Sequence, residues 1–386
     1  MKRLVVCCDG TWNRMSAAEP TNVLMAAQSV LSSDPRGVQQ VTYYDEGVGT
    51  TYVVSRKIET MLAGAFGLGL LDKIEAAYRF LIFNYEPGDE IFIFGFSRGA
   101  YTARSLSGLV RKCGIIPRAL AGKIADVIKF YKDKDTHPDS DTAQDFRMNY
   151  SPTVVLKEED RDWRIARNGD PSIIEKLPLL NVAYLGVWDT VGALGVPQHL
   201  LISRLFRTKE KYAFHDEKLS STVASARHAV AIDEDRLSFA PSTWENLDIL
   251  NSAKGSTTAY QQLWFPGGHG SVGGGGNVRG LSNYAFGWVM EGAAAQGLAL
   301  DAARLAEAAS KVDPYAPLHN STEPQGPVER IYRRAARVGP QQRSLLSKSA
   351  VDRLDRLEKK DGTAPWTAYR PGNLRALWPK VGSEEL

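Results

Sequence analysis

One junction in the chain, IFIFGFSRGAYTAR at residues 91–104, restricts the fold more than any other stretch. Its first half is a continuous run of apolar, β-forming residues, which is typical of a buried strand. A Gly-Phe-Ser-Arg-Gly pentad ends that run, and apolar residues then recur at helical spacing up to Gly114 (Ala103, Leu106, Val110 and Cys113). A strand that turns this sharply into an amphipathic helix indicates an α/β protein.

Strand and helix patterns alternate along most of the chain. The strand patterns lie at residues 4–8, 38–47, 182–195 and 260–270, and the helical patterns lie at 20–31, 70–85, 216–231 and 283–309. This alternation predicts a mostly parallel sheet with helices on both faces. In such sheets, functional residues gather at the carboxyl ends of the strands.

The domain organisation follows from where this alternation stops. We predict one α/β domain over residues 1–310, followed by an irregular, charged C-terminal extension, 311–386, that packs on it. Residues 133–180 are polar and rich in proline without a sustained period, so we expect an insertion of loops that stays outside the core.

Composition excludes several classes of protein. The 47 Lys and Arg residues nearly balance the 44 Asp and Glu residues, so no strong overall field favours nucleic acid as a partner. Three cysteines give no disulfide framework and fit a reducing compartment. The apolar run after the N-terminus is too short for a signal peptide, and the run at 61–71 is too short for a bilayer span. We expect a cytoplasmic protein. Export by a route that needs no signal peptide stays open, and the sequence does not specify the oligomeric state.

Ser97 lies at the corner between the predicted strand and helix. Glycines at 95 and 99 would relieve the collisions that side chains meet at so sharp a turn, and the corner would then expose the hydroxyl group. The N–H of Arg98, at the helix N-terminus, would point toward a developing oxyanion. The alternative is a turn serine that caps the helix.

A nucleophilic serine needs a base, and the base needs an acid that holds its tautomer. Of the six histidines, His269 follows a predicted strand within a glycine-rich stretch, whereas His228 reads as a core histidine. Asp189 ends another predicted strand and is the candidate acid, with Asp233 as the competitor. The order Ser97, Asp189, His269 is the one expected of α/β-hydrolases.

The turn Asp9-Gly10-Thr11 follows the first predicted strand. If that strand neighbours the nucleophile strand, the amide of Gly10 or Thr11 could supply a second oxyanion donor, with Asp9 as a structural residue at the site. Asp9 could equally be a turn residue that bonds its own backbone. The stretch CCDGT at 7–11 does not indicate a phosphatase, because Cys7 occupies the position at which the nucleophilic aspartate would be needed.

Two segments are candidate lids over such a site. Residues 196–215 combine apolar and basic side chains as an interfacial helix would, although a packed helix with a basic face is an equal alternative. The glycine-rich segment 49–71 is the second candidate, which we expect to be a loop. No His or Cys cluster has the spacing of a zinc site, and the chemistry needs no metal or other cofactor.

Five blocks of the sequence resemble, in order, the uncharacterised α/β-hydrolase family that includes the catalytic domains of type VI secretion phospholipase effectors. The blocks are CDGTWN at 8–13, YEPGDEIFIFGFSRGAYTAR at 85–104, LGVWDTVGALG at 185–195, AIDEDR at 231–236 and LWFPGGHGSVGGG at 263–275. The resemblance implies an α/β-hydrolase-like fold, the same triad, and a lipid or ester substrate. The sequence departs from the family pattern at Ser271, where family members commonly have an aspartate.

These observations predict a serine hydrolase that cleaves carboxylic esters, including lipid or phospholipid esters, through an acyl-enzyme on Ser97. The expected partners are a small-molecule ester or lipid and a membrane surface, without nucleic acid. A non-catalytic binding or regulatory module on the same fold is the alternative function, because one fold can carry many functions.

Overall fold

The computed structural model of the chain describes residues 1–10, 15–47, 58–167, 169–192, 218–322, 334–356 and 368–378, with the backbone alone for 58–68 and Ser238. Its centre is a six-stranded sheet in the order β2-β1-β3-β4-β5-β6, and every neighbouring pair is parallel. The strands are β1 (Arg3–Cys8), β2 (Gln40–Asp45), β3 (Glu90–Phe96), β4 (Val182–Trp188), β5 (Ala226–Ala231) and β6 (Tyr260–Phe265). The α/β-hydrolase-like prediction is confirmed.

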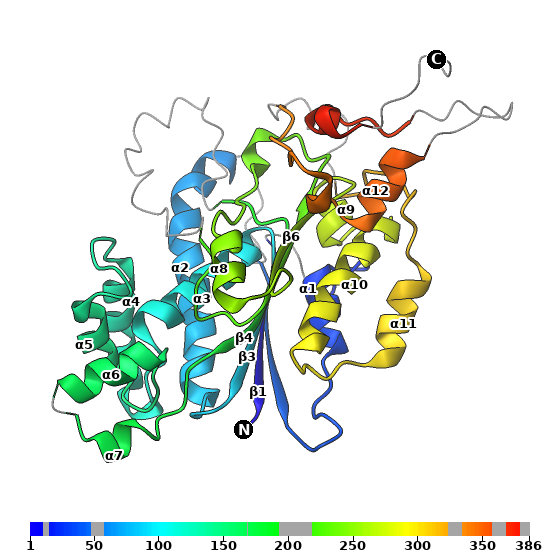
Figure 1. Cartoon of the computed structure of the whole chain (residues 1–386). Helices are drawn as coiled ribbons and strands as arrows, with labels where there is room; N and C mark the ends of the chain where they lie inside the picture. Colours follow the sequence, from blue (N-terminus) through cyan, green and yellow to red (C-terminus); the bar gives the residue numbers. More distant parts are fainter. Residues whose placement is uncertain are drawn as a thin grey trace, which may run out of the picture.

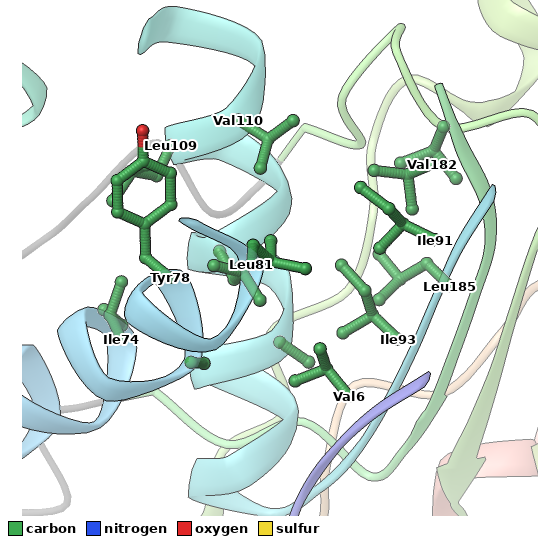
Figure 2. Close-up of a cluster of buried hydrophobic side chains, with 14 of the residues drawn as sticks. Val6, Ile74, Tyr78, Leu81, Ile91, Ile93, Leu109, Val110, Val182 and Leu185 are labelled. Carbon is green, nitrogen blue, oxygen red and sulfur yellow. The ribbon is translucent and has the colours of Figure 1, made fainter. Parts of the chain in front are cut away.

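Helices cover both faces of the sheet (Figure 1). One face carries α2 (Ile58–Asn84), α3 (Arg98–Cys113), α4 (Ile124–Lys132) and α8 (Leu247–Lys254), and the other carries α1 (Asn22–Ser29), α9 (His269–Gly273), α10 (Gly280–Ala295) and α11 (Ala302–Ser310). Figure 2 shows Val6 and Ile93 of the strands pointing toward Leu81 of α2. All three are fully buried, as expected for strands that are covered on both sides.

The insertion at 133–180 is helical, so the expectation of loops outside the core was wrong. It forms α5 (Asp141–Tyr150), α6 (Glu158–Ala166) and the short α7 (Pro171–Ile174). Asp160 is fully buried between Arg147 and Arg164, at 3.3 Å and 3.7 Å. The charged residues that hid the helical pattern are therefore partly internal, and Val154 and Val155 pack in the buried interior.

Three other segments differ from their predictions. Residues 58–71 belong to α2 rather than to a loop, and the rest of that candidate lid, 49–57, lies outside the described residues. The helical pattern at 216–231 ends as strand β5, and 283–309 is split into α10 and α11 by Gly297, whose φ is 95°. The candidate lid at 196–215 lies outside the described residues as well.

The C-terminal extension packs against the outer strand β6. Its described helical elements are η5 (Arg343–Leu345), α12 (Lys348–Asp355) and η6 (Gly372–Leu377). Elsewhere in the described residues, the short 3-10 helices are η1 (Arg118–Lys123) and η3 (Leu237–Phe239). Leu346 and Ala350 form a separate apolar cluster with Trp264, and Leu346 pairs with the backbone of that strand residue. In Figure 1 these orange and red segments lie at the top, opposite the end of the sheet where β1 begins. No helix within the described ranges is long and apolar enough to cross a membrane.

Candidate active site

Ser97 occupies a strained corner between β3 and α3. Its φ of 58° and ψ of −124° are unusual for a residue with a side chain, and it is 5% exposed. A Cβ at Gly95 would lie 2.5 Å from the carbonyl oxygen of Gly99, and one at Gly99 would lie 2.1 Å from that of Cys8. The glycines therefore permit the close approach that the corner requires. The hydroxyl of Ser97 makes no capping hydrogen bond to α3, which argues against the capping alternative.

Asp189 follows the last residue of β4 and also has a positive φ, 36°. Its side chain is fully buried, and both carboxylate oxygens accept hydrogen bonds. Oδ1 accepts the backbone N–H of Ala231 at 2.9 Å, and Oδ2 lies 2.6 Å from Nδ1 of His269. The carboxylate thus reaches across the strand ends, as the sequence suggested.

His269 is the first residue of α9, the short helix that comes shortly after β6. Its ring packs against two aromatic rings, with centroids 4.6 Å from Phe96 and 4.8 Å from Phe239. Its backbone N–H donates to Glu234 at 3.2 Å. The imidazole is therefore held by a carboxylate at one edge and by aromatic packing on its sides.

The parallel strands bring these three residues to one edge of the sheet. The N–H of Ser97 donates to the carbonyl oxygen of Trp188, the residue before Asp189, at 3.1 Å. Phe96, the residue before Ser97, packs on the ring of His269. Serine, carboxylate and imidazole thus lie at the ends of β3, β4 and β6.

A fourth residue, Arg337, contacts Asp189 and was missed by sequence reasoning. Its Nη1 donates to Oδ1 at 2.6 Å and its Nη2 donates to Oδ2 at 2.9 Å, so the guanidinium spans the carboxylate. Arg337 lies in the C-terminal extension among several arginines, and nothing in the sequence distinguishes it from its neighbours.

The charge state of Asp189 follows from these contacts. Burial alone would raise the pKa of the Asp189 carboxyl, but Arg337 and His269 more than offset burial and hold the pKa well below its usual range. An ionised carboxylate only accepts hydrogen bonds, so Nδ1 of His269 carries the proton in this pair. When the ring carries this proton alone, Nε2 is the acceptor, which is the tautomer that a general base needs.

The competing residues have other roles in the structure. Asp233 accepts the N–H of Gly267 at 2.6 Å and the hydroxyl of Tyr369 at 2.8 Å. His228 is fully buried in β5, where Nε2 accepts the N–H of Thr190 at 3.2 Å and Nδ1 lies 2.9 Å from Oε1 of Gln262. Burial, together with the cation of Arg104, lowers the pKa of His228 to about 3, so this histidine is neutral at physiological pH.

Two of the three candidate oxyanion donors, the N–H groups of Arg98 and Gly10, belong to described residues. Arg98 is the first residue of α3, where backbone N–H groups have no partner within the helix. The N–H of Gly10 donates to Oδ1 of Asp9 at 2.7 Å, while Oδ2 of Asp9 accepts the hydroxyls of Thr21 and Tyr44. Asp9 therefore bonds its own turn, and Gly10 could serve an oxyanion only by giving up that bond. Thr11 lies outside the described residues.

Ser271, where the resembling family commonly has aspartate, is buried in α9, two residues after His269. Its Oγ makes no hydrogen bond within the described part of the chain. Glu234 instead supplies the carboxylate beside this loop, through the backbone N–H of His269. In the described residues, no group of three or more His, Cys, Asp or Glu side chains is arranged to hold a metal ion.

The chain is similar to several known proteins. An uncharacterized protein of Saccharomyces cerevisiae is 27% identical over 255 residues, which are 62% of this chain and 32% of the yeast protein. A solved but uncharacterized protein from Pseudomonas aeruginosa is similar with a TM-score of 0.40 and 16% identity, over 78% of this chain and 46% of that one. The Tle1 effector bound to the VgrG spike of the type 6 secretion system gives a TM-score of 0.37 and 16% identity, over 71% of this chain and 51% of the effector.

The chain therefore spans about a third of the yeast relative and about half of each solved protein. Residues 2–292, well over half of the chain, match one family, described as "T6SS, Phospholipase effector Tle1-like, catalytic domain". The sequence blocks that resembled this family lie within the match. The chain belongs to the family of Tle1-like phospholipase effector catalytic domains.

Proposed function

We propose that this chain is a serine hydrolase that cleaves carboxylic esters of lipids or phospholipids. The observation that carries the proposal is the hydrogen-bonded pair of His269 and Asp189 beside the strained corner of Ser97. The lipid substrate class rests on the family to which the chain belongs.

In the proposed reaction, Oγ of Ser97 attacks the ester carbonyl carbon while Nε2 of His269 takes the hydroxyl proton. The N–H of Arg98 stabilises the tetrahedral oxyanion, and His269 then gives its proton to the departing alcohol. The acyl group stays on Ser97 until a water molecule, activated by the same imidazole, hydrolyses it. Asp189 stabilises the imidazolium at each stage and keeps Nδ1 protonated.

The test combines covalent labelling with turnover of esters of increasing chain length. We expect a fluorophosphonate probe to label the wild-type protein and not Ser97→Ala, and ester hydrolysis to fall by at least about 1,000-fold in that variant. Asp189→Asn should lower hydrolysis by a similar factor, because the amide cannot stabilise an imidazolium.

Phospholipid vesicles, assayed beside short soluble esters, then decide whether a lipid is the preferred substrate. A folded wild-type protein that neither reacts with the probe nor hydrolyses any ester would contradict the proposal and favour a non-catalytic binding module. Undiminished labelling of Ser97→Ala would contradict the assignment of the nucleophile.

A further inference from the structure

The guanidinium of Arg337 has four hydrogen bonds, and all of them lie at the edge of the candidate site. Two go to the oxygens of Asp189, and the others go to the carbonyl oxygens of Ala231 at 2.8 Å and Phe239 at 2.6 Å. Ala231 also donates its N–H to Asp189, and the ring of Phe239 packs edge-on against His269. One buried side chain thus joins Asp189 to two backbone carbonyl groups, those of Ala231 and Phe239, that lie beside the pair of His269 and Asp189.

The backbone that carries Arg337 is itself fixed against the site. Arg334 pairs with Arg236 in an antiparallel bridge, and the N–H of Ala335 donates to the carbonyl oxygen of Asp235 at 2.8 Å. Arg337 is 7% exposed, although Val338, the next residue, is 88% exposed. Arg337 therefore points inward although residues 334–336 and 338 are exposed, which argues against an incidental surface ion pair.

Arg337 also lies outside the part of the chain that matches the family, which ends at residue 292. We propose that the C-terminal extension completes the active site, with Arg337 as a positioning residue that fixes the carboxylate of Asp189 toward His269. This inference rests on the proposed function. It adds to that function a residue that neither the family match nor the sequence pattern includes.

Two physical effects of Arg337 on the pair can be separated. Its planar fork holds both carboxylate oxygens in one orientation, which a lysine ammonium cannot do. Its positive charge also opposes the formation of a second positive charge on the imidazole of His269. Loss of the charge should therefore make the imidazole easier to protonate. Loss of the planar fork alone should disturb only the orientation of the Asp189 carboxylate.

The other charged and titratable groups that face this pair stay in place in the test. Glu234 accepts the backbone N–H of His269 and is paired with Arg236 at 2.7 Å, and both partners are buried. His228 and Asp233 flank them on the neighbouring strand and loop. Because none of these groups is altered, a shift in proton uptake between variants reports on Arg337.

The experiment compares Arg337→Met, which is of similar length and uncharged, with Arg337→Lys, which keeps the charge without the fork. Arg334→Met is the matched control, because Arg334 is in the same segment but pairs with Asp235 at the surface, at 3.0 Å. Each variant is assayed for kcat/KM against pH with a short soluble ester, and thermal unfolding checks that it is folded.

We expect kcat/KM of Arg337→Met to fall by about tenfold or more and the acid limb of its pH profile to move to higher pH. Arg337→Lys should lose part of the rate while its acid limb stays near that of the wild type. Arg334→Met should match the wild type in both. The inference is overturned if Arg337→Met, once folded, keeps the wild-type rate and profile, or if it loses rate through kcat with no shift of the acid limb.

A second readout does not depend on turnover. NMR titration of the histidine ring nitrogens, with His269→Ala used for assignment, measures where the imidazole takes up its proton. The upward shift in Arg337→Met should be visible there even if no ester is cleaved, so failure of the proposed function and failure of this inference are distinguishable. Coincident titration curves for wild type and Arg337→Met would refute the electrostatic coupling.

Discussion

The corners at Ser97 and Asp189 share an unusual backbone, yet they are built from different parts of the chain. Within the described residues, they are the two non-glycine positions with positive φ. The serine corner is made possible by glycines two residues before and two residues after it. The aspartate corner is held by side chains and backbone up to 148 residues away, in β5, α9 and the C-terminal extension.

This difference separates local from long-range control of one site. The serine corner depends on residues that are its neighbours in the sequence, so it can be recognised from the sequence. A corner held by remote groups depends on the rest of the fold and on their charge. Substitutions beside Ser97 should therefore act through steric collisions. Substitutions around Asp189 should act through charge, and their effects should depend on pH.

The largest expected effect comes from breaking the local corner with Gly99→Ala. The new Cβ would lie 2.1 Å from the carbonyl oxygen of Cys8 and 2.5 Å from that of Asp9, and both are backbone atoms that move only if β1 shifts. We expect the free energy of unfolding to fall by about 3 kcal/mol, with loss of probe labelling. Urea unfolding measures the first effect.

Gly287→Ala is the control for this change, because it lies in α10 with open space around its Cα. Alanine favours a helix over glycine, so this variant should be slightly more stable than the wild type. Equal stability of Gly99→Ala and the wild type would show that the serine corner tolerates a side chain at 99 and is less tightly built than the distances indicate.

The second prediction tests the sensitivity of the aspartate corner to pH. His228 supports the residue after Asp189 by accepting the N–H of Thr190, and its pKa in the folded protein is about 3 because of burial and then the Arg104 cation. The unfolded chain takes up a proton near pH 6.5 and the folded protein does not, so stability rises with pH between these values. Acidification from pH 6.5 to 5 should cost about 2 kcal/mol.

Urea unfolding at the two pH values, for the wild type and for His228→Gln, measures that cost. The variant lacks the titrating group, so its stability should change less over the same interval. If both proteins lose the same amount between these pH values, another group is responsible, and the buried histidine does not link the aspartate corner to pH.

The difference between the corners also explains what the sequence could predict. Gly95, Ser97 and Gly99 lie within five residues, so local pattern was sufficient to place the turn. The ends of buried strands led to Asp189 and His269, because parallel strands finish at one edge of the sheet. Arg337 could not be found in this way, since its partner is 148 residues away and no periodicity in its own segment marks one arginine among several.

The errors in secondary structure have related causes. Glycines lower helix propensity, so residues 58–71 were predicted as a loop, whereas they form the first part of α2, which includes the buried Leu70 and Leu71. The helices α5 and α6 escaped notice because charged residues such as Asp160 and Arg164 lie on their buried sides, where a sequence pattern predicts apolar residues. In α5 and α6, tertiary contacts of the charged residues outweighed the local pattern.

The smallest predicted effect measures the strain stored at the serine corner itself. At φ 58° and ψ −124°, a side chain costs about 1 to 3 kcal/mol, which glycine does not incur. Glycine in turn loses up to about 1 kcal/mol more entropy on folding. Ser97→Gly should therefore be about 1 kcal/mol more stable than Ser97→Ala, which keeps the Cβ and its strain, and both lack the hydroxyl. Thermal unfolding of the two variants side by side measures the difference. If Ser97→Gly is no more stable than Ser97→Ala, the backbone at residue 97 is not strained, and in this respect the corner does not differ from an ordinary turn.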